Sequence, residues 1–116
     1  MLTISNNNII RVIRGDSFTL NFRDFVVNTL EPDCTLHPGD SLYFGLMEPN
    51  KPFECALIRK KVTNDTESDM ESVFMEFSPE MTERIMPGVY YYSVKIERAN
   101  GKVETLVKKT KFYIID

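Results

Sequence analysis

The chain has 116 residues, 42% of them hydrophobic, and a net charge of −3 at pH 7. This length fits one domain, which we place at residues 1–116, and the hydrophobic content favours a packed core over disorder. The acidic balance argues against a nucleic-acid partner, and no apolar run reaches the roughly 18 residues of a membrane span. Residues 1–16 lack the pattern of a signal peptide, so we expect synthesis inside the cell.

Two strands joined by a turn are predicted at the start of the chain. Residues 8–13 are β-branched and apolar, and residues 16–22 alternate between apolar and polar side chains. The connecting tripeptide, Arg14-Gly15-Asp16, is known for binding integrins. Glycine accepts a positive φ without a steric penalty, and aspartate hydrogen-bonds its own backbone in turns. We therefore interpret Gly15 and Asp16 as turn residues rather than as a receptor ligand.

A second Gly-Asp pair opens the next clear strand pattern. Pro38-Gly39-Asp40 precedes residues 41–48, in which alternate apolar side chains point to one face. We interpret Gly39 and Asp40 as the same structural device as the first pair. Gly45, on the opposite face, indicates a bulge or a close backbone approach. A further strand is predicted over residues 53–63.

An acidic hairpin tip is predicted after this strand, at residues 64–72, and is followed by a strand over 72–77. Alternating carboxylates can bind a cation, but an EF-hand loop needs a glycine that this run lacks, so we predict no metal site. The run also contains the glycosylation sequon Asn64-Asp65-Thr66, which has no role without secretion. Its acidic residues are Asp65, Glu67, Asp69 and Glu71.

One short helix and a long hairpin are predicted in the last third of the chain. Ser78 suits the helix cap, Pro79 suits the first helical position, and Gly88 follows in a turn. The hairpin over residues 89–116 turns at Asn100-Gly101, a dipeptide that favours a type I′ turn.

Together these elements predict an all-β fold, an antiparallel β-sandwich of about seven strands with one short helical crossover. Periodicity does not separate a sandwich from a closed barrel, so the barrel is the alternative. No repeat, linker or low-complexity tract divides the chain.

Residues 78–96, SPEMTERIMPGVYYYSVKI, resemble a corner of immunoglobulin-like sandwiches. In that fold a short helical turn crosses between the sheets and leads into a strand with a tyrosine near its start. Tyr90 matches that tyrosine best, and Tyr92 is second. The resemblance implies an immunoglobulin-like sandwich. A true antibody-type domain is excluded, because the chain has no Trp and its cysteines do not lie on the strands that an inter-sheet bridge needs.

A broader resemblance spans residues 10–114. The segments RGDSFTLNF, HPGDSLYFGL, SPEMTERIMPGVYYYSVKI and NGKVETLVKKTKFYI follow in this order. The series resembles small β-sandwich structural proteins of phages and prophages of Gram-positive bacteria, and is similar to the N-terminal domain of phage baseplate upper proteins. The resemblance implies synthesis in the bacterial cytoplasm and a structural role in a virion. Tail, baseplate, fibre and capsid accessory positions all fit, with other particle proteins or further copies as partners.

Tyr43, Tyr91 and Tyr113 are the interface candidates, because each lies out of phase with the apolar stripe of its strand. Tyrosine is enriched at protein interfaces. We assign Tyr90 and Tyr92 to the core instead. Two basic clusters, at residues 59–61 and 108–111, are interpreted as charges that protect exposed strand edges.

The sequence shows no pattern for catalysis, metal binding or a cofactor. His37 is the single histidine, and no serine or cysteine is plainly paired with it. Cys34 and Cys55 form no Cys-x-x-Cys motif, and we favour free thiols over a disulfide between them.

The sequence therefore predicts a non-enzymatic structural protein that acts through protein–protein contacts. A homo-oligomer is expected, formed through a sheet face or an exposed edge strand. The alternative is a carbohydrate-binding module, which stacks sugars on exposed aromatic rings and which the absence of Trp weakens. An enzyme is the third hypothesis and would need a cluster of titratable groups.

Overall fold

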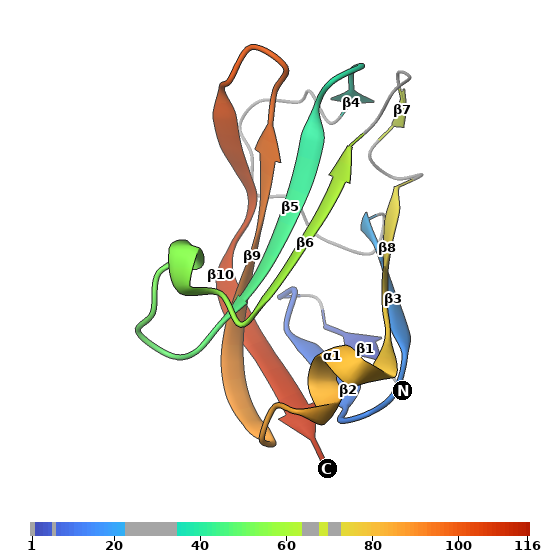
Figure 1. Cartoon of the computed structure of the whole chain (residues 1–116), viewed down its shortest axis with the longest axis vertical. Coiled ribbons are helices and arrows are strands. Elements are labelled where there is room, and N and C mark those ends of the chain that lie inside the picture. Colours follow the sequence, from blue (N-terminus) through green and yellow to red (C-terminus); the bar gives the residue numbers. More distant parts are fainter. Residues whose placement is uncertain (1, 6, 23–34, 64–67, 70–72) are drawn as a thin grey trace.

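The computed structural model describes residues 2–5, 7–22, 35–63, 68–69 and 73–116. Within these ranges the chain is mostly β-structure, arranged as one six-stranded sheet and two small two-stranded sheets (Figure 1). The large sheet has the strand order β1-β2-β10-β9-β5-β6. Its strands are β1 (Thr3–Ile4), β2 (Ile10–Ile13), β10 (Val103–Ile115), β9 (Gly88–Glu97), β5 (Ser41–Met47) and β6 (Ile58–Thr63).

The small sheets and two helical turns complete the described elements. The small sheets pair β3 (Phe18–Asn21) with β8 (Phe74–Phe77), and β4 (Thr35–Leu36) with β7 (Ser68–Asp69). Helix α1 covers Pro79–Glu83, and a 3-10 turn, η2, covers Phe53–Cys55. In the described ranges the strands form separate sheets rather than one closed barrel. No helix in these ranges has the length and apolar character needed to cross a membrane.

The six-stranded sheet is mixed, so the prediction of a purely antiparallel fold was wrong. β2 pairs with β10 in parallel, with Ile10 opposite Phe112 and Ile13 opposite Ile115. The antiparallel expectation came from hairpins, whose short loops make neighbouring strands run in opposite directions. β2 and β10 lie near the two ends of the chain, so no short loop sets their relative direction.

The β3–β8 sheet packs over one face of the six-stranded sheet and builds the core with it. Phe44 and Phe77 meet across the layers with 5.1 Å between ring centroids, and Phe18 and Phe112 with 6.2 Å. Such aromatic pairs contribute about 0.5–1.5 kcal/mol each beyond their burial. Tyr92 lies fully buried among these rings, and burial raises its pKa. We call this face of the six-stranded sheet the inner face and its opposite side the outer face.

Two connections cross between the layers and are tied to each other. The turn after β2 leads into β3, and α1 leads from β8 into β9 as the predicted helical crossover (Figure 1). The Gly15 amide donates a 3.0 Å hydrogen bond to Oγ1 of the buried Thr82 in α1. Ser78 occupies the cap position of α1 without a capping hydrogen bond to the backbone. The backbone amide of Glu80, followed by the Ser78 hydroxyl, lowers the pKa of the Glu80 carboxyl.

The β9–β10 hairpin does not form the predicted type I′ turn. That turn needs a positive φ at both central residues, but at Asn100-Gly101 only Gly101 has one, at +91°. The Gly101 amide donates to the Arg98 carbonyl at 2.9 Å, so a type I turn precedes a left-handed glycine. The Asn100 side chain stabilises this arrangement, because it accepts a 3.0 Å hydrogen bond from the Lys102 amide.

The strand predicted over residues 53–63 begins only at Ile58. Residues 53–55 form η2 instead, which places the Phe53 ring directly on Gly45 of β5. A Cβ atom at Gly45 would lie 2.5 Å from that ring. The close approach predicted at Gly45 is therefore made by a side chain rather than by a backbone.

Candidate interaction surface

The three tyrosines that the sequence singles out lie on the outer face. All three are half-buried, and each ring is accompanied by a cation. The contacts contribute about 0.5–1 kcal/mol each at exposed sites. The cation-to-centroid distances are 5.4 Å for Lys61 and Tyr43, 5.8 Å for Lys109 and Tyr91, and 4.8 Å for Arg11 and Tyr113.

The segment between β5 and β6, residues 48–57, covers the centre of the outer face. Its Phe53 ring packs on Gly45, with the Lys95 ammonium 4.6 Å from the ring centroid. Lys109 Nζ donates to the Lys51 carbonyl at 2.7 Å and thereby ties the segment to β10. Figure 1 shows η2 on the side of the six-stranded sheet away from β3 and β8. The centre of this face is therefore occupied by the chain itself.

The end of the outer face next to α1 exposes apolar side chains instead. Ile13 and Ile115 are cross-strand neighbours, and Val89 lies opposite Tyr113. Val89 also lines one groove together with Leu57 and Met86. The five aliphatic side chains are each between 41% and 77% exposed, and a contiguous group of this kind marks an interaction site more often than scattered ones do. We call Ile13, Leu57, Met86, Val89, Tyr113 and Ile115 the outer-face patch.

The groove within the patch has a volume of about 470 Å³. Met86 and Val89 line it beside Ile85, and its charged residues are Glu48 and Arg84. The Tyr90 hydroxyl donates to the Met86 carbonyl at 2.6 Å. A tyrosine hydroxyl bonded to the backbone a few residues upstream is the geometry of a tyrosine corner. This bond holds the chain on one wall of the groove in place.

The strands of the outer face carry many cations, although the chain as a whole is acidic. Interface rims are polar, and a basic rim selects partners with carboxylates. Because the net charge is −3, the excess of carboxylates lies elsewhere on the molecule. The cations are Arg11, Arg59, Lys61, Lys95, Lys109 and Lys111.

The two basic clusters lie on different strands of the six-stranded sheet, β6 and β10. β6 is an edge strand and carries residues 59–61, with Lys60 turned inward and its ammonium 6.0 Å from the Phe77 centroid. Inward-pointing charge protects an edge against pairing. Residues 108–111 precede the part of β10 that pairs with β2, which is 112–115, so in the described ranges only β9 pairs along this stretch. Lys108 and Lys109 lie where the register between β10 and β9 shifts, and Lys111 is opposite Tyr91.

The predicted turn residues lie in tight turns, except Gly88, for which the prediction was wrong because it is the first residue of β9. Gly15 and Gly39 have φ angles of +84° and +90°. The amides of Asp16 and Asp40 donate to the carbonyls three residues earlier, at 3.1 and 3.0 Å. Arg14 pairs with Asp116 at 3.2 Å, so the tripeptide makes contacts within the fold. The remaining turn candidates, Asn100 and Gly101, form the hairpin turn.

Asp40 is the centre of a buried polar network. Its carboxylate accepts hydrogen bonds from the His37 and Ala99 amides, both at 2.9 Å, and from Arg98 Nη1 at 3.0 Å. Burial opposes ionisation, but the two amides and the Arg98 guanidinium outweigh it and lower the pKa of Asp40. Arg98 also contacts Glu104 at 3.4 Å. The network joins two loops and has a structural role.

The candidate metal ligands and thiols are partly covered by the described residues. Within the described ranges, no group of three His, Cys, Asp or Glu residues is placed to hold a metal ion. His37 is exposed in its turn, and Cys55 is an exposed free thiol. The second cysteine, Cys34, lies outside the described residues, as does most of the acidic hairpin tip, namely Asn64, Asp65, Thr66, Glu67 and Glu71.

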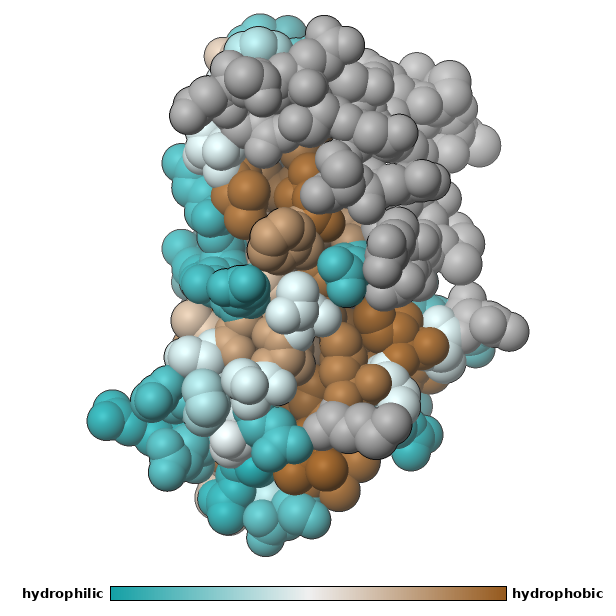
Figure 2. Space-filling model, turned by 90° about the vertical axis from the view of Figure 1, so that its right-hand side faces the viewer, coloured by the Kyte–Doolittle hydropathy of each residue, from teal (hydrophilic) through white to brown (hydrophobic). Residues whose placement is uncertain are grey.

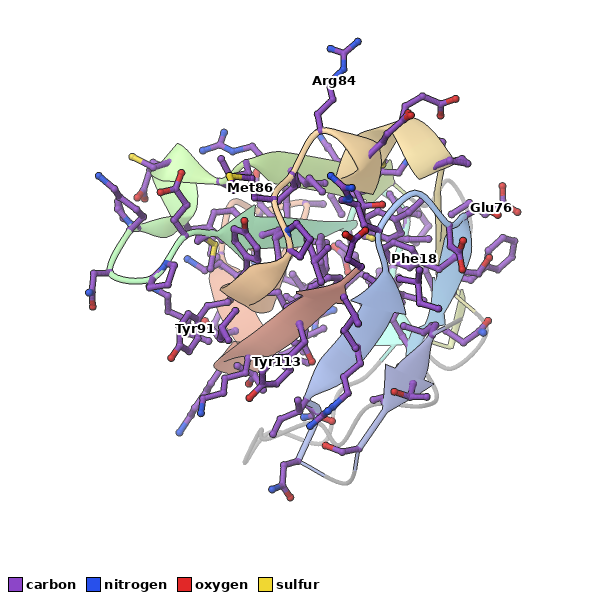
Figure 3. The ribbon with its side chains drawn as sticks, turned by 90° about the horizontal axis from the view of Figure 1, so that it is seen from below. Phe18, Glu76, Arg84, Met86, Tyr91 and Tyr113 are labelled. Atoms are coloured by element: carbon purple, nitrogen blue, oxygen red, sulfur yellow. The ribbon has the colours of Figure 1, made fainter. Side chains whose placement is uncertain are left out.

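Sequence reasoning placed Tyr113 in this surface but missed the aliphatic residues around it. Tyr91 of β9 and Tyr113 of β10 are diagonal neighbours on adjacent strands (Figure 3). Tyr43 lines a separate hollow together with Phe53. Strand alternation in the sequence could have identified three residues of the patch. Ile13, Val89 and Ile115 are out of phase with the buried stripes of their strands. Met86 and Leu57 lie in connections, where strand periodicity gives no information.

Comparison with known proteins assigns no family. No family model matches the chain, and no curated protein or solved structure matches it either.

Proposed function

We propose that this chain is a non-enzymatic structural protein that assembles through its outer face, as a component of a phage or prophage particle. The outer-face patch is the observation that carries this proposal. It combines a contiguous apolar centre with Tyr113 and with Arg11 at its side. Aromatic residues, methionine and arginine are enriched at protein interfaces, and tyrosine and arginine are among the residues that contribute most to their free energy.

An immunoglobulin-like β-sandwich is the fold that we propose for this module. Two packed layers of β-sheet, a helical crossover at α1 and the tyrosine corner at Tyr90 support it. Such sandwiches present sheet faces and loops to partners, as a structural protein that acts through protein–protein contacts requires.

Docking through a sheet face is favoured over pairing through an edge strand. At one edge of the large sheet, β6 carries consecutive charges with Lys60 turned inward. At the other edge, β1 is two residues long and β2 four, and the stretch of β10 before Phe112, which β2 does not reach, carries Lys108, Lys109 and Lys111. Short and charged edges resist the addition of a strand. We therefore place the partner on the outer-face patch.

The cations on the outer face weigh against the carbohydrate-binding alternative. Stacking on a sugar needs an aromatic ring with an open face. Lys61, Lys109 and Arg11 already lie over the rings of the three outer tyrosines. A sugar would have to displace these contacts first.

Incorporation into particles tests the proposal. Two exposed valines of the outer face form a matched pair, since Val89 lies in the patch and Val103 lies at the far end of β10. Particles released by cells that encode the chain are purified and analysed by mass spectrometry. We expect the wild-type chain and Val103→Glu in the particles, and a loss of at least about tenfold for Val89→Glu.

Thermal unfolding of each purified variant shows that the substitution leaves the fold intact. The proposal is contradicted if the wild-type chain is absent from the particles, or if Val89→Glu enters them as well as Val103→Glu does.

A further inference from the structure

The charge of the outer face restricts how copies of this chain can meet. In a twofold contact the same surface of both copies comes together. Outer face against outer face would bring Arg11, Lys109 and Lys111 of one copy against the same cations of the other. Like charges across an interface cost several kcal/mol. A contact in which the second copy presents a different surface to the patch avoids this cost.

The opposite side of the molecule carries such a surface. Phe74 of β8 points away from the core and is 53% exposed, whereas its neighbours Val73 and Met75 are buried. Glu76 follows two residues later on the same side of β8 and is also exposed. Figure 2 views the molecule from the β3–β8 side, and Figure 3 shows Glu76 pointing outward from it, away from Met86 and Tyr113. An aromatic side chain beside a carboxylate thus projects from the side opposite the outer-face patch.

The groove of the outer-face patch offers this projection an apolar cavity and one cation, Arg84, with Glu48 as its one carboxylate. Its volume of about 470 Å³ accommodates an aromatic ring between Met86 and Val89. Arg84, at the same groove, provides a guanidinium for a carboxylate that arrives beside the ring. Aromatic anchors that fill a pocket dominate the free energy of association.

We infer that copies of this chain associate head to tail, with Phe74 of one copy in the groove of the next and Glu76 beside Arg84. This inference rests on the proposed function and names the partner as a second copy. The two surfaces lie on opposite sides of one molecule, so each copy uses both. Such contacts form a ring if the rotation closes and an open filament if it does not.

Sedimentation velocity of the full chain over a concentration series tests the inference. We expect the wild-type mass to rise with concentration. Phe74→Ala removes the projection, and Met86→Glu places a charge in the groove at a side chain that is already 77% exposed. Each should weaken association at least about tenfold, while Val103→Glu, an exposed control outside the groove, should behave as the wild type.

Mixing the two defective variants separates head-to-tail contact from every twofold arrangement. Phe74→Ala keeps an intact groove, and Met86→Glu keeps an intact projection, so an equal mixture should form a dimer that neither forms alone. The charge pair gives a second readout. Glu76→Arg and Arg84→Glu should each weaken association several-fold, and the double variant should recover most of the loss.

Three results would contradict the head-to-tail contact. Association that Phe74→Ala does not weaken, or a mixture that stays monomeric, overturns the head-to-tail contact. A wild-type chain that is monomeric at every concentration also overturns it. If Val89→Glu is still excluded from particles in that case, the proposed function stands and the partner is another protein.

Discussion

The turns at Arg14-Gly15-Asp16 and Pro38-Gly39-Asp40 share a backbone conformation but differ in what anchors them. Both have a glycine of positive φ and an aspartate amide that donates three residues back. In the second turn the anchor is the buried Asp40 carboxylate. In the first it is the Gly15 amide, which donates to Thr82. A Gly-Asp motif therefore specifies the turn but not the atom that ties it to the rest of the fold.

The largest effect is expected from removal of the Asp40 carboxylate. Asp40→Ala leaves the Arg98 guanidinium and two amides without their acceptor, so it should lower the free energy of unfolding by about 3 kcal/mol. The control is Asp116→Ala, which removes the exposed partner of Arg14 and should cost at most about 0.5 kcal/mol. Urea denaturation measures both values, and equal losses would contradict the assignment of Asp40 as an anchor.

Thr82→Val tests the anchor of the first turn. Valine keeps the shape of threonine but leaves the Gly15 amide without its acceptor, so we expect a loss of about 2 kcal/mol. NMR hydrogen exchange provides a local readout, because the Gly15 amide should exchange faster in the variant. An unchanged exchange rate at Gly15 would show that the hydrogen bond does not hold this turn.

Alanine substitutions at Gly15 and Gly39 compare how tightly the two turns are packed. Both substitutions force a side chain into left-handed backbone, which costs about 1 kcal/mol. A Cβ atom at Gly39 also comes within 3.1 Å of Ala99 Cβ, whereas none lies within 4 Å at Gly15. We expect losses of about 2 kcal/mol for Gly39→Ala and about 1 kcal/mol for Gly15→Ala. Denaturation curves that rank them in the opposite order would contradict the packing argument.

Acidification should affect the second turn through Asp40. Its pKa is lower in the folded chain than in the unfolded chain. The carboxylate therefore stabilises the fold fully above about pH 4, and this contribution is lost as the pH falls through the folded-state pKa. The free energy of unfolding of the wild type should fall more steeply with acid than that of Asp40→Asn. If the free energy of unfolding of the two proteins fell in parallel with pH, Asp40 would not be the cause of the loss of stability in acid.

The candidate surface was predictable only where strand alternation applied to it. The rule that selected Tyr91 and Tyr113 also applies to Ile13, Val89 and Ile115, which share their face. It also selected Tyr43, which lines a separate hollow together with Phe53. Alternation reports which face a side chain occupies, but not whether a later segment of the chain covers that face.

The sequence by itself determined the β-rich character, the inward stripes of the main strands and the positions of the tight turns. These features depend on neighbours within a few residues, through the two-residue period of a strand and the backbone freedom of glycine. Tertiary structure alone decided the parallel pairing of β2 with β10, the seating of Phe53 on Gly45 and the exposure of the outer-face patch. Each of these joins residues from separate elements, so its free energy depends on how the strands are ordered in space rather than on any local pattern.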